Sequence, residues 1–225
     1  MKLAIGTIVI VTSLAGLAGR SDAQSCVGTA SFAAGIVRLG ASAAFTDGAK
    51  QYSGGLALGA PHGVFAAVDA GSISYDGGGG ASTVVGANLG YDVAVGPGAS
   101  FCPIVAYSHV SFPDVRVGGS TITTSENVVA FGGAFGVTAT VAPNLDLVPY
   151  LAGEYAHASA SESETGVGSD SQSQDYGVLS VGVGFVINKM FTFGPSVAVP
   201  VGITGGKTSV SIGLSINFGH SGTAP

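Results

Sequence analysis

The stretch Ser209-Val-Ser-Ile-Gly-Leu-Ser-Ile-Asn-Phe218 decides the fold. Bulky apolar residues alternate there with small or polar ones: Val210, Ile212, Leu214, Ile216 and Phe218 against Ser209, Ser211, Gly213, Ser215 and Asn217. Because successive side chains of a strand point to opposite faces, the stretch predicts a β-strand with one wholly apolar face. That face could contact lipid or the core of a soluble sandwich, so the rest of the chain must decide between them.

The composition indicates that much of this protein does not face water. Charged residues make up 9% of the chain and hydrophobic residues 46%, and the mean hydropathy is +0.53. An ordinary soluble domain carries about 25% charged residues. A disordered Gly/Ser-rich chain is poor in apolar residues. No run after residue 23 reaches the roughly 18 apolar residues of a membrane-spanning helix. Since lipid admits only helices and closed barrels, the composition favours a β-barrel.

Residues 1–23 have the three-part pattern of a cleaved signal peptide. Lys2 supplies a positive start, residues 3–18 form an apolar run, and Ser21-Asp22-Ala23 offers small residues for cleavage. A membrane anchor is the alternative, but the run is short and no stop-transfer charges follow it. The expected mature chain then consists of a periplasmic N-terminal segment, a barrel and a C-terminal tail: 24–35, 36–218 and 219–225.

Ten segments show strand-like patterns bounded by turn-forming Gly, Pro, Asn and Asp residues. The expected strands are 36–47, 50–60, 63–75, 82–95, 102–113, 122–141, 146–160, 175–188, 190–202 and 208–218. The alternation is irregular in 63–75 and 102–113, so the facing of their side chains stays open.

The connections between these strands are sorted by length. Every second connection, counted from the N-terminus, is tight: 60–63, 96–98, 142–144 and 188–189. The others include the long ones: 76–81, 113–121 and the polar run 159–174. Outer-membrane barrels have short periplasmic turns and longer extracellular loops on alternate sides, whereas a soluble sandwich has no reason to sort its loops in this way.

The chain from about Ile36 to Phe218 resembles the small outer-membrane β-barrel families, the class that includes OmpA-like transmembrane domains. Its closing strand, 209–218, resembles their C-terminal membrane-insertion signal, an alternating strand that ends in Phe, here Phe218. Two features depart from the pattern, since residues 219–225 follow that Phe and the aromatic girdle lacks Trp. The resemblance implies an outer-membrane location, insertion by the barrel-assembly machinery, and contact with outer-membrane lipid and lipopolysaccharide.

We therefore expect an all-β fold, a single antiparallel up-and-down transmembrane barrel of ten strands, with eight as the alternative. Two cysteines, Cys26 and Cys102, fall on the periplasmic side of this topology. The periplasm is oxidising, so we expect a disulfide between them rather than free thiols. Two cysteines without partnered histidines do not make a metal site, and we expect no metal or cofactor.

Five polar residues are expected to point into the barrel. Arg38, Asp92 and Asn217 would lie near the periplasmic end, and Asp69 and Glu154 near mid-height. They are interpreted as a network that fixes the barrel's shape, or alternatively as a cation-favouring constriction. Because small residues dominate the inward positions, we expect no large side chains to close the interior and therefore a hydrated lumen. The segment 24–35 is the alternative plug.

Other functions receive less support from the sequence. The few basic residues argue against nucleic-acid binding. The histidines are scattered, and His157 and Glu154 fall on opposite faces of one strand, so we expect no enzyme and no catalytic residues. The acidic run 159–174 is expected to be a solvated loop. The favoured function is a structural component or narrow water-filled pore. An adhesin-like surface-binding barrel and an outer-membrane hydrolase are the alternatives, and the oligomeric state stays open.

Overall fold

The computed structural model describes residues 28–29, 37–60, 63–77, 80–117, 119–166 and 168–219. The elements within this part are all β-strands. Ten of them form the barrel: β1 (Val37–Thr46), β2 (Ala49–Gly59), β3 (Val64–Tyr75), β4 (Ala81–Tyr91), β6 (Ala99–Ser111), β8 (Ser120–Val137), β10 (Leu145–Glu164), β11 (Gly168–Ile187), β12 (Phe191–Val201) and β13 (Ser209–Phe218). Three short strands pair at the margins: β5 (Val93–Gly96), β7 (Val115–Val117) and β9 (Ala139–Ala142). No helix in the described part is long and apolar enough to cross a membrane.

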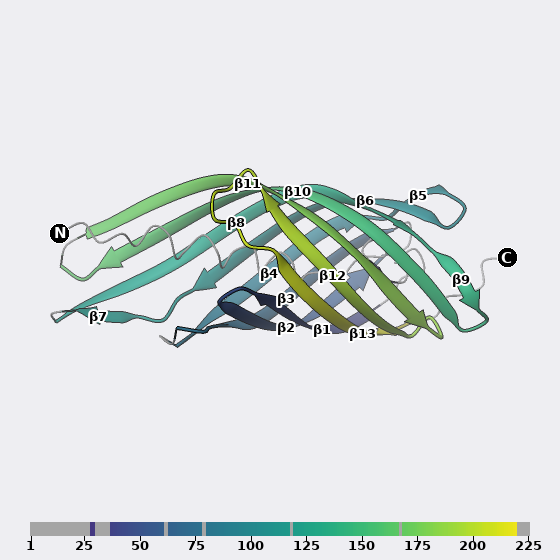
Figure 1. The fold of residues 1–225 in the computed structure, drawn as a ribbon, viewed down its shortest axis with the longest axis horizontal. Helices are drawn as coiled ribbons and strands as arrows, with labels where there is room; N and C mark the ends of the chain where they lie inside the picture. The colour runs from purple at the N-terminus through teal and green to yellow at the C-terminus, as the bar shows by residue number, and fades with distance from the viewer. Residues whose placement is uncertain are drawn as a thin grey trace.

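The ten long strands close into a ring. Each pairs antiparallel with its neighbours, and the pairings of β1 with β13 and of β6 with β8 complete the circle. The strands are strongly tilted along the long axis of the molecule (Figure 1). The predicted ten-stranded antiparallel barrel is confirmed.

The alternation of β13 sorts its side chains as the sequence predicts. Val210, Ile212, Leu214, Ile216 and Phe218 are exposed on the outside, while Ser209, Ser211 and Asn217 are buried inside. The same division holds around the ring, since the exposed large hydrophobic residues lie on every barrel strand. A closed antiparallel barrel with an apolar exterior and small or polar inward positions has the architecture of outer-membrane barrels.

The expected strands 82–95 and 122–141 are each interrupted. The first splits into β4 and β5 at Asp92, whose backbone N–H donates to the carbonyl of Gly63, 2.8 Å away. The second splits into β8 and β9 at Thr138, whose N–H donates to the carbonyl of Gly98 at 2.6 Å. In both places the backbone bonds to a neighbouring turn instead of continuing the ladder.

The predicted loop 159–174 is wrong, because these residues form a hairpin. Strands β10 and β11 stay paired from Leu145↔Ile187 to Glu164↔Gly168. Strand β8 follows β10 to Glu164↔Ile122, and β7 pairs with β8 in turn. These strands extend beyond the rest of the barrel (Figure 1). We call residues 115–117, 120–125, 159–164 and 168–176 the projecting sheet, its end of the barrel the projecting end, and the other end the base.

Outward aromatic residues form two groups along the barrel. Toward the projecting end lie Phe45, Tyr52, Tyr107, Phe131 and Tyr155, and toward the base lie Tyr91, Phe101, Phe135, Phe191, Phe193 and Phe218. In the first set, Phe131 lies directly opposite Tyr155, and the ring centroids of Phe45 and Tyr52 lie 6.5 Å apart. Aromatic residues of outer-membrane barrels gather toward the membrane–water interfaces, and we call these two groups the girdles of the projecting end and of the base; Phe and Tyr form them without Trp.

Candidate functional site

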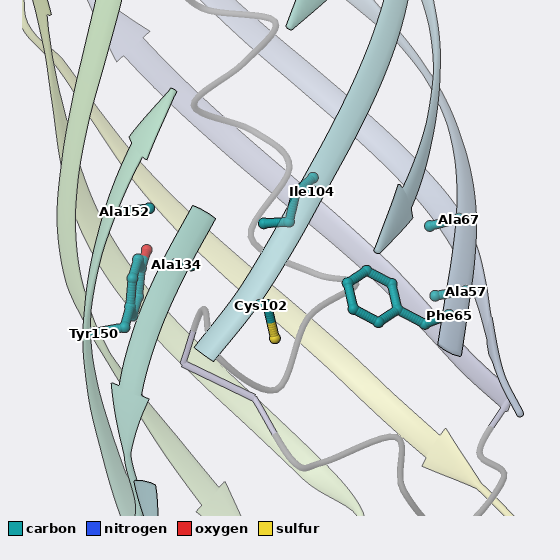
Figure 2. Packing of buried hydrophobic residues seen from close by; sticks show 8 residues of the cluster. All are labelled: Ala57, Phe65, Ala67, Cys102, Ile104, Ala134, Tyr150 and Ala152. Atoms are coloured by element: carbon teal, nitrogen blue, oxygen red, sulfur yellow. The ribbon is translucent and has the colours of Figure 1, made fainter. Parts of the chain in front are cut away.

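Large side chains fill the barrel interior. One buried cluster near the base contains Phe65, Ile104 and Tyr150, which point inward together with Cys102 (Figure 2). A second contains Val128 and Tyr176, and a third, toward the projecting end, contains Ile73, Val84 and Val110. The expectation that no large inward side chain closes the interior is wrong.

Glycines explain how large side chains fit among so many small ones. A Cβ added to Gly90 would collide with the ring of Phe65, and one added to Gly182 would lie 2.6 Å from Tyr150. A residue on one strand therefore fills the space that a glycine leaves on the next. The inward glycines indicate neighbouring bulk rather than an empty lumen.

The base of the interior is held by a polar network around Arg38, which is 1% exposed. Its Nε donates to Oδ1 of Asn217 at 2.6 Å, and its Nη1 donates to Oγ1 of Thr29 at 2.8 Å. The Asn217 amide also donates to the carbonyl of Lys189 at 3.3 Å. Thr29 is itself buried, and the backbone of neighbouring Gly28 lies against Gly184 of β11. The described part of the N-terminal segment therefore lies inside the barrel.

Among the described residues, the other inward-facing charges include Asp92, Asp69 and Glu154, which the sequence predicted, and Glu126, which it did not and which is 1% exposed. Asp92 is buried near the base. Asp69 and Glu154 occupy inward positions on β3 and β10, opposite Gly86 and Gly132. Each carboxyl side chain lies over its glycine, since a Cβ on Gly86 would be 2.6 Å from Oδ1 of Asp69 and one on Gly132 would be 2.9 Å from Cγ of Glu154. A shape-fixing role and a cation-favouring constriction both remain predictions for these residues.

Hydroxyl groups line the wall formed by β12, β13, β1 and β2. Ser42 and Ser53 hydrogen-bond at 2.7 Å, and Ser196 and Ser211 at 2.5 Å. These bonds cross between adjacent strands and tie the wall together. The interior therefore has a polar side and, on β6, β8 and β10, a mainly apolar side.

Cys102 faces this interior and is fully buried, and it is not a free thiol. Cys26 lies outside the described residues, so the Cys26–Cys102 disulfide stays a prediction. The signal peptide (1–23), most of 24–35, and the tail beyond Gly219 also lie outside the described residues.

Two ion pairs lie at the projecting end, on the side of the barrel opposite the projecting sheet. Lys207 Nζ lies 2.6 Å from Oδ2 of Asp47 in the β1–β2 turn, and Lys50 Nζ lies 3.5 Å from Oδ1 of Asp76. The hydrogen bond from Lys207, together with its charge, lowers the pKa of the Asp47 carboxyl. Both pairs are largely exposed and contribute little to stability.

A hydrogen-bonded polar patch lies on the outside of the barrel, next to the aromatic girdle of the projecting end. Oδ1 of Asn127 accepts from the Tyr107 hydroxyl at 2.7 Å and lies 2.9 Å from Nδ1 of His109. Nε2 of His109 lies 3.1 Å from Oγ of Ser111. We call His109, Ser111 and Asn127 the outer triad.

A second polar pair lies close by on β10 and β11. Nδ1 of His157 is 2.7 Å from Oδ1 of Asp175. Both members of the pair are more than half exposed. Glu154 points inward, so the structure does not bring it together with His157.

The sequence reasoning missed the outer triad, although its signal was present. His109 and Ser111 are two residues apart in a strand, and this spacing places them on one face. Asn127 joins them only because β6 pairs with β8 in the register His109↔Asn127. The register of 102–113 stayed open at the sequence level, and the scattered histidines therefore showed no partner.

Comparisons with known proteins add no function. No family model matches the sequence and no curated protein matches it. Similar solved structures include the N-terminal barrel domain of Pseudomonas aeruginosa OprF (13% identity, 82% of this chain and 99% of that chain, TM-score 0.38). Another is the translocator domain of Neisseria meningitidis autotransporter NalP (12% identity, 82% of this chain and 87% of that chain, TM-score 0.49). A third is Ail, the attachment invasion locus protein of Yersinia pestis (14% identity, 82% of this chain and 97% of that chain, TM-score 0.38).

Proposed function

We propose that this protein is a closed barrel of the bacterial outer membrane that acts as a structural component and carries the projecting sheet on the cell surface. The observation that carries the proposal is the filled interior. Phe65, Ile73 and Val128 are each at most 1% exposed, a burial that leaves no room for water beside them. The apolar exterior between two aromatic girdles supports the membrane location.

The buried side chains of the interior argue against a solute pore. A water-filled pore needs one continuous open path, and buried side chains occupy the interior both near the base and toward the projecting end. Arg38 and Thr29 add a hydrogen-bonded layer at the base. The Cys26–Cys102 disulfide, if present, would tether the N-terminal segment there and stabilise this closure.

Planar-bilayer recording of the refolded protein tests the closed interior. We expect no stepwise conductance from the natural chain. Replacing Phe65 and Tyr150 together by alanine removes two large side chains from the basal cluster and should produce measurable conductance or faster liposome swelling. Phe101→Ala with Phe135→Ala removes two outward aromatic residues and is the matched control. Steady ionic conductance through the natural protein would contradict the proposal and favour the narrow pore.

A second candidate function, binding of a partner at the cell surface, is favoured by one specific observation. Strand β11 pairs with β12 only from Gly177↔Val201 onward, whereas its pairing with β10 continues to Gly168. Among the described residues, 168–176 thus have a ladder partner on one side only. Such an edge can accept an additional strand. Asp170 and Asp175 make it acidic, so a positively charged extended segment is the partner that fits.

A nine-residue peptide of alternating Thr and Lys is a direct probe of this edge. We expect it to bind the folded protein in fluorescence anisotropy, because main-chain pairing and charge both favour it. A peptide of the same sequence with N-methylated backbone amides is the control and should not bind, since it cannot form the ladder. Asp170→Lys should weaken binding about three- to tenfold. Equal binding of both peptides would show that charge alone attracts them and would contradict pairing at the edge.

A further inference from the structure

The outer triad has the hydrogen-bond order of a nucleophile, a base and an orienting group. The carboxamide oxygen of Asn127 accepts hydrogen bonds, so Nδ1 of His109 must donate to it. The other ring nitrogen, Nε2, then carries the lone pair and accepts from the hydroxyl of Ser111, 3.1 Å away. A histidine held in this tautomer can take the serine proton as that oxygen attacks a carbonyl.

Neighbouring contacts fix the orienting group. The Tyr107 hydroxyl donates to the same Asn127 oxygen at 2.7 Å. This second bond holds the carboxamide with its oxygen toward His109. Two adjacent strands supply all four residues, and strands are rigid supports for such an arrangement.

The position of the triad indicates which substrates can reach it. Tyr107 belongs to the outward girdle of the projecting end, and His109 and Ser111 follow it along β6 on the same face, away from the apolar band. Ser111 is exposed. At this level the outside of the barrel meets the boundary between lipid headgroups and acyl chains, where the ester bonds of membrane lipids lie.

We propose that Ser111, His109 and Asn127 form a catalytic site that hydrolyses acyl esters of membrane lipids. The Ser111 oxygen attacks the ester carbonyl carbon while Nε2 of His109 takes the hydroxyl proton. The carbon–oxygen bond to the alcohol then breaks, the alcohol leaves with that proton, and the acyl group stays on Ser111. Water, activated by the same histidine, hydrolyses this acyl-serine and releases the fatty acid.

This inference rests on the proposed membrane location and not on the closed interior. The chain also offers a matched comparison in His157. That histidine lies on the neighbouring part of the same outer face and pairs with Asp175, but no hydrogen bond joins it to a serine among the described residues. It has an orienting partner without a nucleophile, so its loss should leave the activity unchanged.

The experiment uses the full chain refolded in detergent micelles, with two probes. The first is a dilauroyl phosphatidylethanolamine substrate, from which fatty-acid release is measured. The second is a fluorophosphonate that reacts with activated serines, with the site of the adduct mapped by mass spectrometry. We expect fatty-acid release, and an adduct on Ser111. Ser111→Ala should abolish both, and His109→Ala should lower both by about 10²-fold or more. Asn127→Ala should lower both as well, whereas His157→Ala should retain them.

Each result decides the proposal. The variants replace residues on the outside of the barrel, and a heat-dependent shift in gel mobility verifies that each one is folded. Absence of release and of adduct in the natural chain would overturn the site and leave the triad as a polar contact to lipid headgroups. An equal loss of activity in His109→Ala and His157→Ala would also overturn it. Failure to associate with micelles at all would contradict the membrane location and with it this site.

Discussion

At the scale of single residues, the interior depends on pairs formed by a glycine and a large neighbour. Phe65 lies over Gly90, and Tyr150 lies over Gly182, each pair joining two adjacent strands. The glycine weakens its own strand through lost conformational entropy, but it creates the space that a ring fills on the next strand. The glycine and the ring can be explained only as a pair, and the register between the two strands brings them together.

Replacing Gly90 by alanine should therefore destabilise the barrel. The new methyl group would overlap the Phe65 ring, which is 1% exposed and has no free space to move into. Overpacking of this kind costs about 1–3 kcal/mol. Gly54→Ala is the control, because its nearest neighbour would be the carbonyl oxygen of Gly40 at 3.7 Å, and it should be neutral or slightly stabilising. Urea unfolding followed by tyrosine fluorescence measures both variants. Equal stabilities would show that the ring does not hold its position.

At the scale of elements, the strands that face lipid could be predicted from the sequence, and the projecting sheet could not. Strand β13 follows a strict alternation because one face meets lipid and the other a polar interior. Residues 159–174 are mainly Ser, Gln, Gly and acidic residues with solvent on both faces, so no periodicity marks them as strand. Their hairpin continues a ladder that begins inside the barrel, so pairing started elsewhere overrides weak local preference.

For the residues of the candidate site, the direction of a side chain could be predicted from the sequence, but its hydrogen-bond partner could not. Arg38 and Asn217 could be assigned to the interior because both belong to strands with clear alternation. Their direct hydrogen bond depends on the register Arg38↔Asn217 between the first and last barrel strands, which are far apart in the sequence. The outer triad likewise needs the β6–β8 register. The local alternation of a strand thus determines whether a side chain points into or out of the barrel. Its hydrogen-bond partner on another strand is determined only when the barrel closes.

At the scale of the whole molecule, loop lengths and the aromatic girdles imply one orientation. The projecting sheet, the Lys207–Asp47 pair and the outer triad all lie toward one end. The base carries short connections, such as 143–144 and 188–190. Outer-membrane barrels place short turns in the periplasm and longer elements outside the cell. The base should therefore face the periplasm, and the projecting end should face the medium.

Labelling of single cysteines in intact cells tests this orientation. Ser171→Cys lies in the exposed projecting sheet, and Asn144→Cys lies in the exposed turn that joins β9 to β10 at the base. A membrane-impermeant maleimide should modify residue 171 in intact cells. It should reach residue 144 only after the outer membrane has been opened, because the membrane then no longer separates the reagent from the base. The natural chain supplies the background, since its Cys102 is fully buried and is not a free thiol. Labelling at 144 and not at 171 would reverse the orientation. It would also move the outer triad to the inner leaflet, so lipids of that leaflet would become its substrates.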